Sequence, residues 1–318
     1  MTAVSRRSLG SIIASASIRI ALVSILAYVP STLAGTIVRI STGIGDYSIE
    51  LLDDSAPGTV QNFLNYVNRN AYNGTYIHRA VDNFVVQGGG FRFRLFEGPI
   101  DVPSDPPIQN EFGASNTRGT VAMAKLDGNP DSATNQWFVN VADNSATLDT
   151  SNGGFTVFGI VLGDGMATVD EIDALPVVAL GGKAPNAPHI TPVYTDPRDF
   201  LYINAEVTQR FSSAPHVFES GTGLLITSVS IDSGADLISM NFNVVAASPN
   251  VVIRANAESA IPRRDSFEGI AEYSTVNGRL RIPSLEVNLN GSISVATNVV
   301  FVLTDAATAS FTLESFDQ

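Results

Sequence analysis

The sequence predicts a mainly β protein, with a closed β-barrel capped by two helices and then an all-β, sandwich-like domain. Between residues 36 and 207, short apolar segments alternate with Gly-rich turns, and only two stretches have helical spacing. From about residue 209 onward the alternation continues without any helical period. A chain of 318 residues also suits two domains, since single domains usually span ~100–200 residues.

The first domain is expected over residues 35–208. Its helices are expected from Pro57, a residue tolerated at the first helical position, and at 167–175, where Pro176 ends the helix. Strands are expected at 37–40, 47–51 and 200–207. Closing such a sheet into a barrel leaves no exposed edges, which is why a barrel is favoured.

A proline-rich stretch, 181–197, allows two interpretations. It could be an interdomain linker, or a long loop before the last barrel strand. The loop is favoured because apolar and polar residues still alternate over 201–206, as in a strand.

The second domain is expected over residues 209–318. Strand-like alternation covers 225–231, 237–245, 279–289 and 292–303. Asn277-Gly278 and Asn290-Gly291 are expected to form two-residue hairpin turns in which both residues adopt positive φ. The domain offers no catalytic constellation, so a binding or surface-association module is favoured over a second enzyme. A purely structural extension is the remaining alternative.

Charge and cysteine content exclude several classes of function. The net charge is −13 and no basic cluster occurs, which argues against nucleic-acid binding. The absence of cysteine excludes disulfides, thiolate nucleophiles and cysteine-based zinc sites. The scattered histidines and a poor match to a calcium loop at 127–138 predict no metal site, and no motif calls for a cofactor.

The N-terminus predicts export. Arg6 and Arg7 precede an apolar run at 20–29 and small residues up to Ala34, which together form the pattern of a signal peptide over 1–34. A membrane anchor is the alternative, but the run is about half of the ~20 residues that span a bilayer. A periplasmic or secreted bacterial protein is expected, with no membrane span in the mature chain. The general secretory and twin-arginine routes both remain open.

Four ordered blocks carry a family resemblance. They are Tyr76–Gly90, Arg118–Ala124, Asn135–Val141, and Leu148-Asp149 with Phe155–Gly159. Together they resemble the cyclophilin family of peptidyl-prolyl cis-trans isomerases, most closely its exported bacterial members, with an extra C-terminal β domain. The resemblance covers about residues 36–207 and implies that proline-containing polypeptides are the substrates.

The reaction itself dictates what a catalyst must do. Rotation about an X-Pro bond meets a barrier of ~18–20 kcal/mol, because the amide must lose its resonance. A catalyst has to grip the proline ring and stabilise a twisted amide whose nitrogen has regained a lone pair. Arginine suits the second task, since it is always charged and presents several donors in a fixed fork.

The resemblance assigns roles to individual residues. Arg79 is implied as the central catalytic group, with Phe84 beside it and Gln87 hydrogen-bonded to the substrate backbone. The apolar pocket for the proline ring is implied at Phe84, Val85, Phe138 and Leu148. The peptide groove is implied at Ala124, the Lys125 backbone and Gln136, and an aromatic wall at Phe155.

Three positions depart from the best-known cytosolic members. Thr147 replaces a tryptophan, Phe155 a histidine and Val85 a methionine. Phe155 keeps an aromatic wall, so activity is expected to survive. The missing tryptophan predicts weak binding of cyclosporin-type inhibitors.

Less specific interpretations accompany these assignments. Arg79 alone could be an arginine in a structural ion pair, and His78 is expected to be a structural, hydrogen-bonded histidine because the reaction needs no proton transfer. The predicted function is acceleration of X-Pro rotation in exported proteins, which assists their folding. The alternative is a non-catalytic client-binding or surface-adaptor protein that uses a cyclophilin-shaped module.

Overall fold

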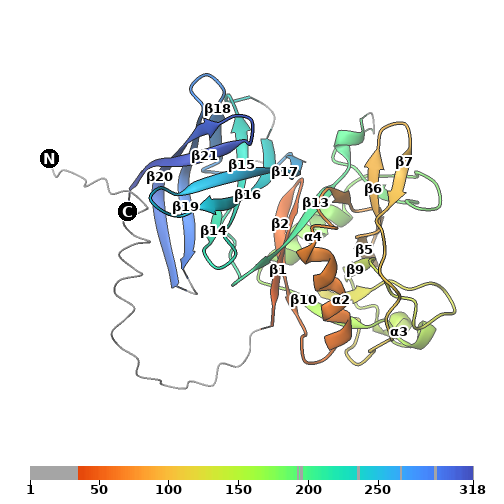
Figure 1. Cartoon of the computed structure of the whole chain (residues 1–318). Coiled ribbons are helices and arrows are strands. Elements are labelled where there is room, and N and C mark those ends of the chain that lie inside the picture. Colours follow the sequence, from red (N-terminus) through yellow and green to blue (C-terminus); the bar gives the residue numbers. More distant parts are fainter. Residues whose placement is uncertain are drawn as a thin grey trace, which may run out of the picture. The chain divides into compact units, whose positions relative to one another are not determined.

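The computed structural model describes residues 35–317, except for 192, 194–195, 235–236, 266 and 290–291. The predicted signal peptide over 1–34 and the predicted turn at Asn290-Gly291 therefore lie outside the described residues. The described chain divides between Ser213 and Ala214 into two compact units. Figure 1 shows both units and labels many of their strands.

The first unit is built on one sheet with the order β4-β5-β9-β8-β10-β2-β1-β13-β3-β6-β7. Its strands are β1 (Ile37–Thr42), β2 (Gly45–Leu51), β3 (Thr75–Tyr76), β4 (Arg79–Val81), β5 (Val85–Gly88), β6 (Phe91–Arg94), β7 (Gly98–Asp101), β8 (Thr120–Met123), β9 (Trp137–Asn140), β10 (Val157–Val161) and β13 (Tyr202–Thr208).

The sheet closes through the continuous segment that carries β3 and β4. β3 pairs with β13, whereas β4 pairs with β5 at the other end of the strand order. Between them, the Ile77 amide donates to the Leu201 carbonyl (3.0 Å) and the His78 amide donates to the Gln87 carbonyl (3.1 Å). The prediction of a closed barrel is confirmed, with β6 and β7 as a hairpin that extends from β3.

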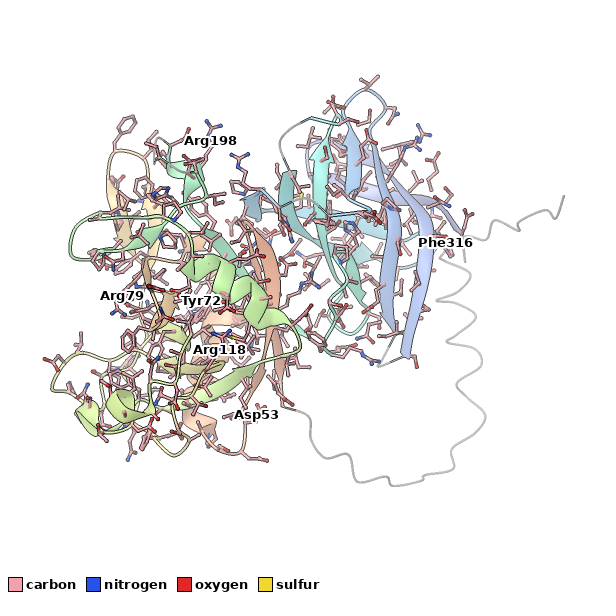
Figure 2. All side chains as sticks on the ribbon, turned by 180° about the vertical axis from the view of Figure 1, so that it is seen from behind. Asp53, Tyr72, Arg79, Arg118, Arg198 and Phe316 are labelled. Atoms are coloured by element: carbon pink, nitrogen blue, oxygen red, sulfur yellow. The ribbon has the colours of Figure 1, made fainter. Side chains whose placement is uncertain are left out.

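The two predicted helices are α2 (Pro57–Asn68) and α4 (Gly165–Asp173). α2 faces the viewer in Figure 1 and α4 faces the viewer in Figure 2, so they cover opposite sides of the barrel. Phe63 and Tyr66 of α2 and Ile172 of α4 are buried in the same core as Trp137. The structure adds three single turns, α3 (Ser145–Leu148) and the 3-10 helices η1 (Ser151–Gly153) and η2 (Pro197–Asp199). None of the described helices is long and apolar enough to cross a membrane.

The proline-rich stretch belongs to the barrel unit. It contains β12 (Ala187–Pro188), which pairs with β11 (Val177–Val178), the short strand that precedes the stretch. The Ala80 amide in β4 donates to the Asn186 carbonyl (2.9 Å), which ties this stretch to the strand that carries Arg79. The described part of 181–197 is therefore a loop of the barrel, as predicted, and not an interdomain linker.

The second unit contains strands and no helix among its described residues. They are β14 (Val217–Glu219), β15 (Leu224–Ile231), β16 (Leu237–Ala246), β17 (Val252–Arg263), β18 (Ala271–Ser274), β19 (Arg279–Leu289), β20 (Ser292–Asp305) and β21 (Ser310–Asp317). The prediction of an all-β domain is confirmed. Its strands form one sheet that closes on itself, because β14 also pairs with β19 and β18 also pairs with β15. The domain is therefore a closed barrel and not the expected sandwich of two sheets.

The turn at Asn277-Gly278 differs from its prediction. Only Gly278 has a positive φ, 66°, and the connection between β18 and β19 covers four residues, 275–278. The Gly278 amide donates to the Ser274 carbonyl (2.8 Å), which closes a wider turn than the two-residue type. The prediction of positive φ at Asn277 is wrong because the longer loop needs only one left-handed residue.

Candidate active site

The β4–β5 hairpin sets Arg79 beside Gln87. The two residues are direct cross-strand partners, so their side chains leave the sheet on the same face. Arg79 Nη1 donates a hydrogen bond to Gln87 Oε1 at 3.2 Å. Gln87 Nε2 in turn donates to Gln136 Oε1 at 2.9 Å. Three of the predicted site residues thus form one hydrogen-bonded row.

Arg79 is half-buried and has no carboxylate partner among the described residues. Figure 2 labels it on β4, a strand that contacts helix α4. Burial lowers the pKa of its guanidinium, which nevertheless stays charged because an arginine pKa starts far above neutrality. The ion-pair interpretation is not supported, and most of its five N–H donors are left for another acceptor.

A tight turn brings Phe84 back to Arg79. Asn83 has φ = 54°, and the Phe84 amide donates to the Val81 carbonyl (2.9 Å). The Asn83 amide also donates to Asp173 Oδ2 of α4 at 3.2 Å, which anchors the turn to the helix. The Arg79 guanidinium carbon lies 5.6 Å from the centroid of the Phe84 ring. The two residues meet although the turn interrupts the strand between them.

An apolar cluster lies next to this row. Phe138 is the cross-strand partner of both Gln87 and Ala122, so it stands in line with the polar row. The rings of Phe138 and Phe155 are 5.9 Å apart and meet edge to face. The cluster has five buried residues, Val85, Ala122, Phe138, Leu148 and Val157, and includes Phe84, Ala124 and Phe155 at its partly exposed margin. All predicted pocket residues therefore come together.

The backbone at Gly90 passes close to the Gln136 side chain and holds it in place. A Cβ on Gly90 would lie 2.8 Å from the Gln136 side-chain carbon Cδ, so the absence of a side chain there makes room for the glutamine. The Ala124 amide donates to the Gln136 carbonyl (2.9 Å), which sets these two predicted groove residues side by side. The missing side chain of Gly90 therefore acts as a spacer.

Comparison with known proteins agrees with this geometry. A family model described as "Cyclophilin type peptidyl-prolyl cis-trans isomerase/CLD" matches residues 37–193. A peptidyl-prolyl cis-trans isomerase of Acinetobacter baylyi is 45% identical over 152 residues, which cover 47% of this chain and 78% of the relative. The chain belongs to the cyclophilin family. Its cyclophilin unit is therefore that of a peptidyl-prolyl cis-trans isomerase.

Other relatives match the same unit. Peptidyl-prolyl cis-trans isomerase A of Dickeya dadantii is 39% identical over 168 residues, which cover 51% of this chain and 85% of that protein. Peptidyl-prolyl cis-trans isomerase B of Escherichia coli is 43% identical over 141 residues, 42% and 82% of the two chains. A solved cyclophilin-type isomerase of Cryptosporidium parvum aligns over 55% of this chain and 99% of its own, with a TM-score of 0.42 and 21% identity.

In this cyclophilin the Lys125 side chain supports the aromatic wall. Its Nζ donates to the carbonyls of Asn152 (2.8 Å) and Gly154 (2.6 Å), and it lies 4.8 Å from the centroid of the Phe155 ring. Burial lowers the pKa of this amine. The sequence implicated only the Lys125 backbone, because nothing in the chain order shows that residues 152–155 return to this lysine.

Three buried asparagines were missed by the sequence analysis. Asn144 Nδ2 donates to the Phe84 carbonyl (2.7 Å) and to Asn140 Oδ1 (2.8 Å). Asn140 Nδ2 donates to Asn116 Oδ1 (3.2 Å), and Asn116 Nδ2 donates to the Phe155 carbonyl (2.9 Å). This network therefore holds the backbones of both aromatic residues at the cluster margin. In the sequence, the sign of this network is the recurrence of asparagine at positions 116, 140 and 144.

Asp149 ends the asparagine network. It accepts hydrogen bonds from the Asn116 amide and side chain, both at 2.9 Å, and from the Ser115 hydroxyl. Burial opposes ionisation of this carboxyl, but the hydrogen bonds from Ser115 and Asn116 outweigh burial and lower its pKa. Asp149 is thus an ionised acceptor that fixes Asn116.

Replacing Asn144 by alanine is expected to lower kcat/KM by roughly tenfold and the free energy of unfolding by ~1–3 kcal/mol, because the Phe84 carbonyl and Asn140 lose a buried donor. Peptide isomerisation kinetics and denaturant titration measure both. Asn68→Ala, at the exposed end of α2, is the matched control. Unchanged activity in Asn144→Ala would mean that the network does not position Phe84.

His78 is buried against the site. Its ring meets Phe91 edge to face at 4.8 Å, and no described residue is hydrogen-bonded to Nδ1. Burial lowers the pKa of His78 to about 4, helped by the charge of Arg79 and opposed by a hydrogen bond with Gln136. The expectation of a buried histidine is confirmed.

Proposed function

We propose that this cyclophilin accelerates rotation about X-Pro bonds in exported polypeptides and so assists their folding, with Arg79, Phe84 and Gln87 as its catalytic groups. The observation that carries the proposal is the convergence of an apolar cluster with a half-buried arginine that has no carboxylate partner among the described residues. Spontaneous X-Pro isomerisation takes tens to hundreds of seconds, slow enough to limit folding.

The proline ring would rest on the apolar cluster. Phe138 and Leu148 are buried there, and Phe84 and Phe155 stand at the margin where a substrate arrives. Apolar contact holds the ring without hydrogen bonds, so the X-Pro carbonyl is free to swing about the C–N bond. This grip acts equally in the ground and transition states and contributes to binding, not to the barrier.

Arg79 would act on the twisted amide. As the C–N bond loses resonance, the proline nitrogen becomes a hydrogen-bond acceptor, which it is not in the planar amide. A donor aimed at that nitrogen is used only in the transition state and lowers the barrier. The hydrogen bond from Arg79 to Gln87, which is held by Gln136, fixes the guanidinium before substrate arrives. No proton changes place.

Gln87, Gln136 and Ala124 would bind the substrate backbone. Gln87 and Gln136 lie within one hydrogen-bonded row, and Ala124 pairs with Gln136 at the start of the Lys125 loop. When the flanking peptide is held in place, the carbonyl can move only by rotation about the C–N bond, so binding restricts the substrate to the reacting motion. Lys125 would line this groove through its backbone while its side chain supports Phe155.

Export is part of the proposal and rests on the signal-like pattern of residues 1–34. Expression of the full chain in a Gram-negative host is expected to yield a periplasmic or secreted product that begins at Gly35. Mass spectrometry of the exported fraction checks the cleavage point. A product that keeps residues 1–34 in the cytoplasm would contradict the export proposal and leave the isomerase assignment untouched.

Cyclosporin-type inhibitors are expected to bind weakly. Thr147 is an exposed residue of α3, next to Leu148, and offers no ring or N–H at the edge of the site. Thr147→Trp is expected to tighten inhibition by roughly tenfold or more, because a tryptophan adds apolar area and an indole donor. Inhibition of peptide isomerisation measures both proteins. Nanomolar inhibition of the unmodified protein would contradict the prediction.

The test of the proposed function is isomerisation of a short X-Pro peptide and refolding of a proline-limited client by the purified protein. Acceleration of both steps is expected. A protein that binds the peptide but leaves both rates unchanged would favour the alternative, a non-catalytic client-binding module. Acceleration of the peptide alone would support the isomerase and argue against a folding role.

A further inference from the structure

The C-terminal barrel contains a cavity at one end of its interior. Its volume is about 310 Å³, and strands β15–β21 all contribute to its wall. The lining residues are Val229, Ile231, Ile238, Met240, Phe242, Ala255, Tyr273, Leu280, Leu303, Ala306, Ala309 and Phe311. Because packed interiors leave few voids larger than a water molecule, this unfilled space stands out in so small a barrel.

The wall of the cavity is apolar and reaches solvent. Phe242 and Leu280 are buried deep in the wall, whereas Ile231 is 38% exposed and Ala306 lies in an exposed turn. The opening is therefore on the turn side of the barrel. An apolar cavity of about 150 Å³ takes a benzene molecule, so this one suits an apolar group of about ten to twelve carbon atoms. Barrel mouths are common ligand sites.

Hydrogen bonds hold the rim of the opening. Asp232, in the turn after β15, accepts from the Thr275 amide (2.7 Å) and hydroxyl, so two turns are joined. The Leu303 amide donates to the Gly278 carbonyl (2.7 Å), which joins β20 to the second of these turns. Asp305 caps the third turn by accepting from the Thr308 hydroxyl (2.7 Å). The mouth is therefore preformed.

The rim is negatively charged. Hydrogen bonds from Thr275 and Thr308 lower the pKa values of Asp232 and Asp305, respectively, so both carboxylates are ionised at neutral pH. The charge of Arg254 also lowers the pKa of Asp305, and the Arg254 side chain donates to Ser310 Oγ (3.4 Å). One guanidinium beside two carboxylates leaves this part of the rim negative. Acidic side chains also outnumber basic ones throughout this unit. An anionic head group would be repelled here.

We propose that this cavity binds a small amphiphile that has an apolar body of about ten carbons and a positively charged head, with the head placed at Asp232 and Asp305. The apolar wall accounts for the body and the rim carboxylates for the head. The site is separate from the isomerase chemistry, since every lining residue lies in the unit that begins at Ala214.

Calorimetric titration of the full chain with decyltrimethylammonium and with decanoate, both below their micelle concentrations, tests the proposal. Saturable one-site binding of the cation is expected, at least roughly fivefold tighter than binding of the anion of equal chain length. No binding of the cation, or equal binding of both, would overturn the proposal.

Matched variants localise the site. Ala255→Phe fills the cavity and is expected to weaken cation binding by roughly tenfold or more, whereas Ala257→Phe, exposed on the same strand, should leave it unchanged. Ala306→Trp, in an exposed turn, is a second blocking variant should Ala255→Phe unfold. Cation binding that survives both folded variants would place the ligand elsewhere and overturn the proposal.

Variants of the two rim carboxylates test the preference for the cationic probe over the anionic one. Asp232→Asn with Asp305→Asn keeps hydrogen-bond acceptors at both turns but removes the charge, and should bring the two probes to within about twofold of each other. Glu258→Gln, an exposed carboxylate on β17 outside the rim, is the control and should keep the preference. An unchanged preference in the double variant would overturn the placement of the head.

Discussion

Replacing Arg79 by alanine is expected to lower kcat/KM for a short X-Pro peptide by ~10²-fold or more, the effect of removing one transition-state donor. KM should change little, because the proline ring rests on the apolar cluster and not on the guanidinium. Fold stability should fall only slightly, since the sole described hydrogen bond of the Arg79 side chain is to Gln87. Steady-state isomerisation kinetics and thermal unfolding measure these quantities.

Two further variants make the Arg79 test specific. Arg79→Lys keeps the charge but loses the planar fork, so it should recover only part of the lost activity. Arg94→Ala, at the exposed end of strand β6, removes an arginine without touching the site and should leave activity unchanged. Full activity in Arg79→Ala would show that the barrier is lowered by another group and would remove Arg79 from the mechanism.

Acidification is expected to destabilise the cyclophilin unit through His78. The pKa of this residue is about 4 in the folded protein and about 6.5 when the chain is unfolded. Between pH 4 and pH 6.5, His78 is therefore protonated in the unfolded state and neutral in the folded state. The contribution to stability is fully present above pH 6.5 and is lost as the pH falls toward 4, by about 3 kcal/mol in total.

The His78 prediction is measured by denaturant titration between pH 7.5 and pH 4.5. Trp137 is the only tryptophan and is buried in the cyclophilin unit, so its fluorescence reports unfolding of that unit alone. His78→Gln cannot gain the proton and should lose ~2–3 kcal/mol less stability over this range than the unmodified protein. Carboxylates that titrate in the same range are common to both proteins and cancel. Equal losses in the two would mean that His78 is protonated without cost.

The sequence predicted most of the barrel because local signals agreed with the final structure. The alternation in β1, β2 and β13 and the helical spacing after Pro57 are properties of neighbouring residues and survive folding unchanged. The turn at Asn277-Gly278 was predicted less well, because loop length is set by how β18 and β19 pair. The strand pairing that closes the sheet at β3 could not be predicted from local patterns, because β3 pairs with β13, more than 100 residues away in the chain.

The candidate site, too, was predicted only in part from the sequence. Its motif residues were visible in the chain order, and Arg79, Gln87, Phe138 and Phe155 do come together. The alternation of side chains along a strand does not by itself bring Arg79 to Phe84, because the turn at Asn83 lies between them. The supporting side chain of Lys125 and the buried asparagines escaped notice, since surface loops and buried networks use the same polar residue types.

By itself the sequence determined the class of the protein, the order of its strands and helices, and the residue types that the reaction requires. Those properties follow from side-chain periodicity and from motifs that are contiguous in the chain. Only the tertiary structure decided how Arg79 is fixed by Gln87 and Gln136, which asparagines hold Phe84 and Phe155, and that the second barrel has an unfilled apolar mouth. The physical reason is that hydrogen-bond partners and packing voids arise between strands distant in sequence, where no local pattern records the distance between them.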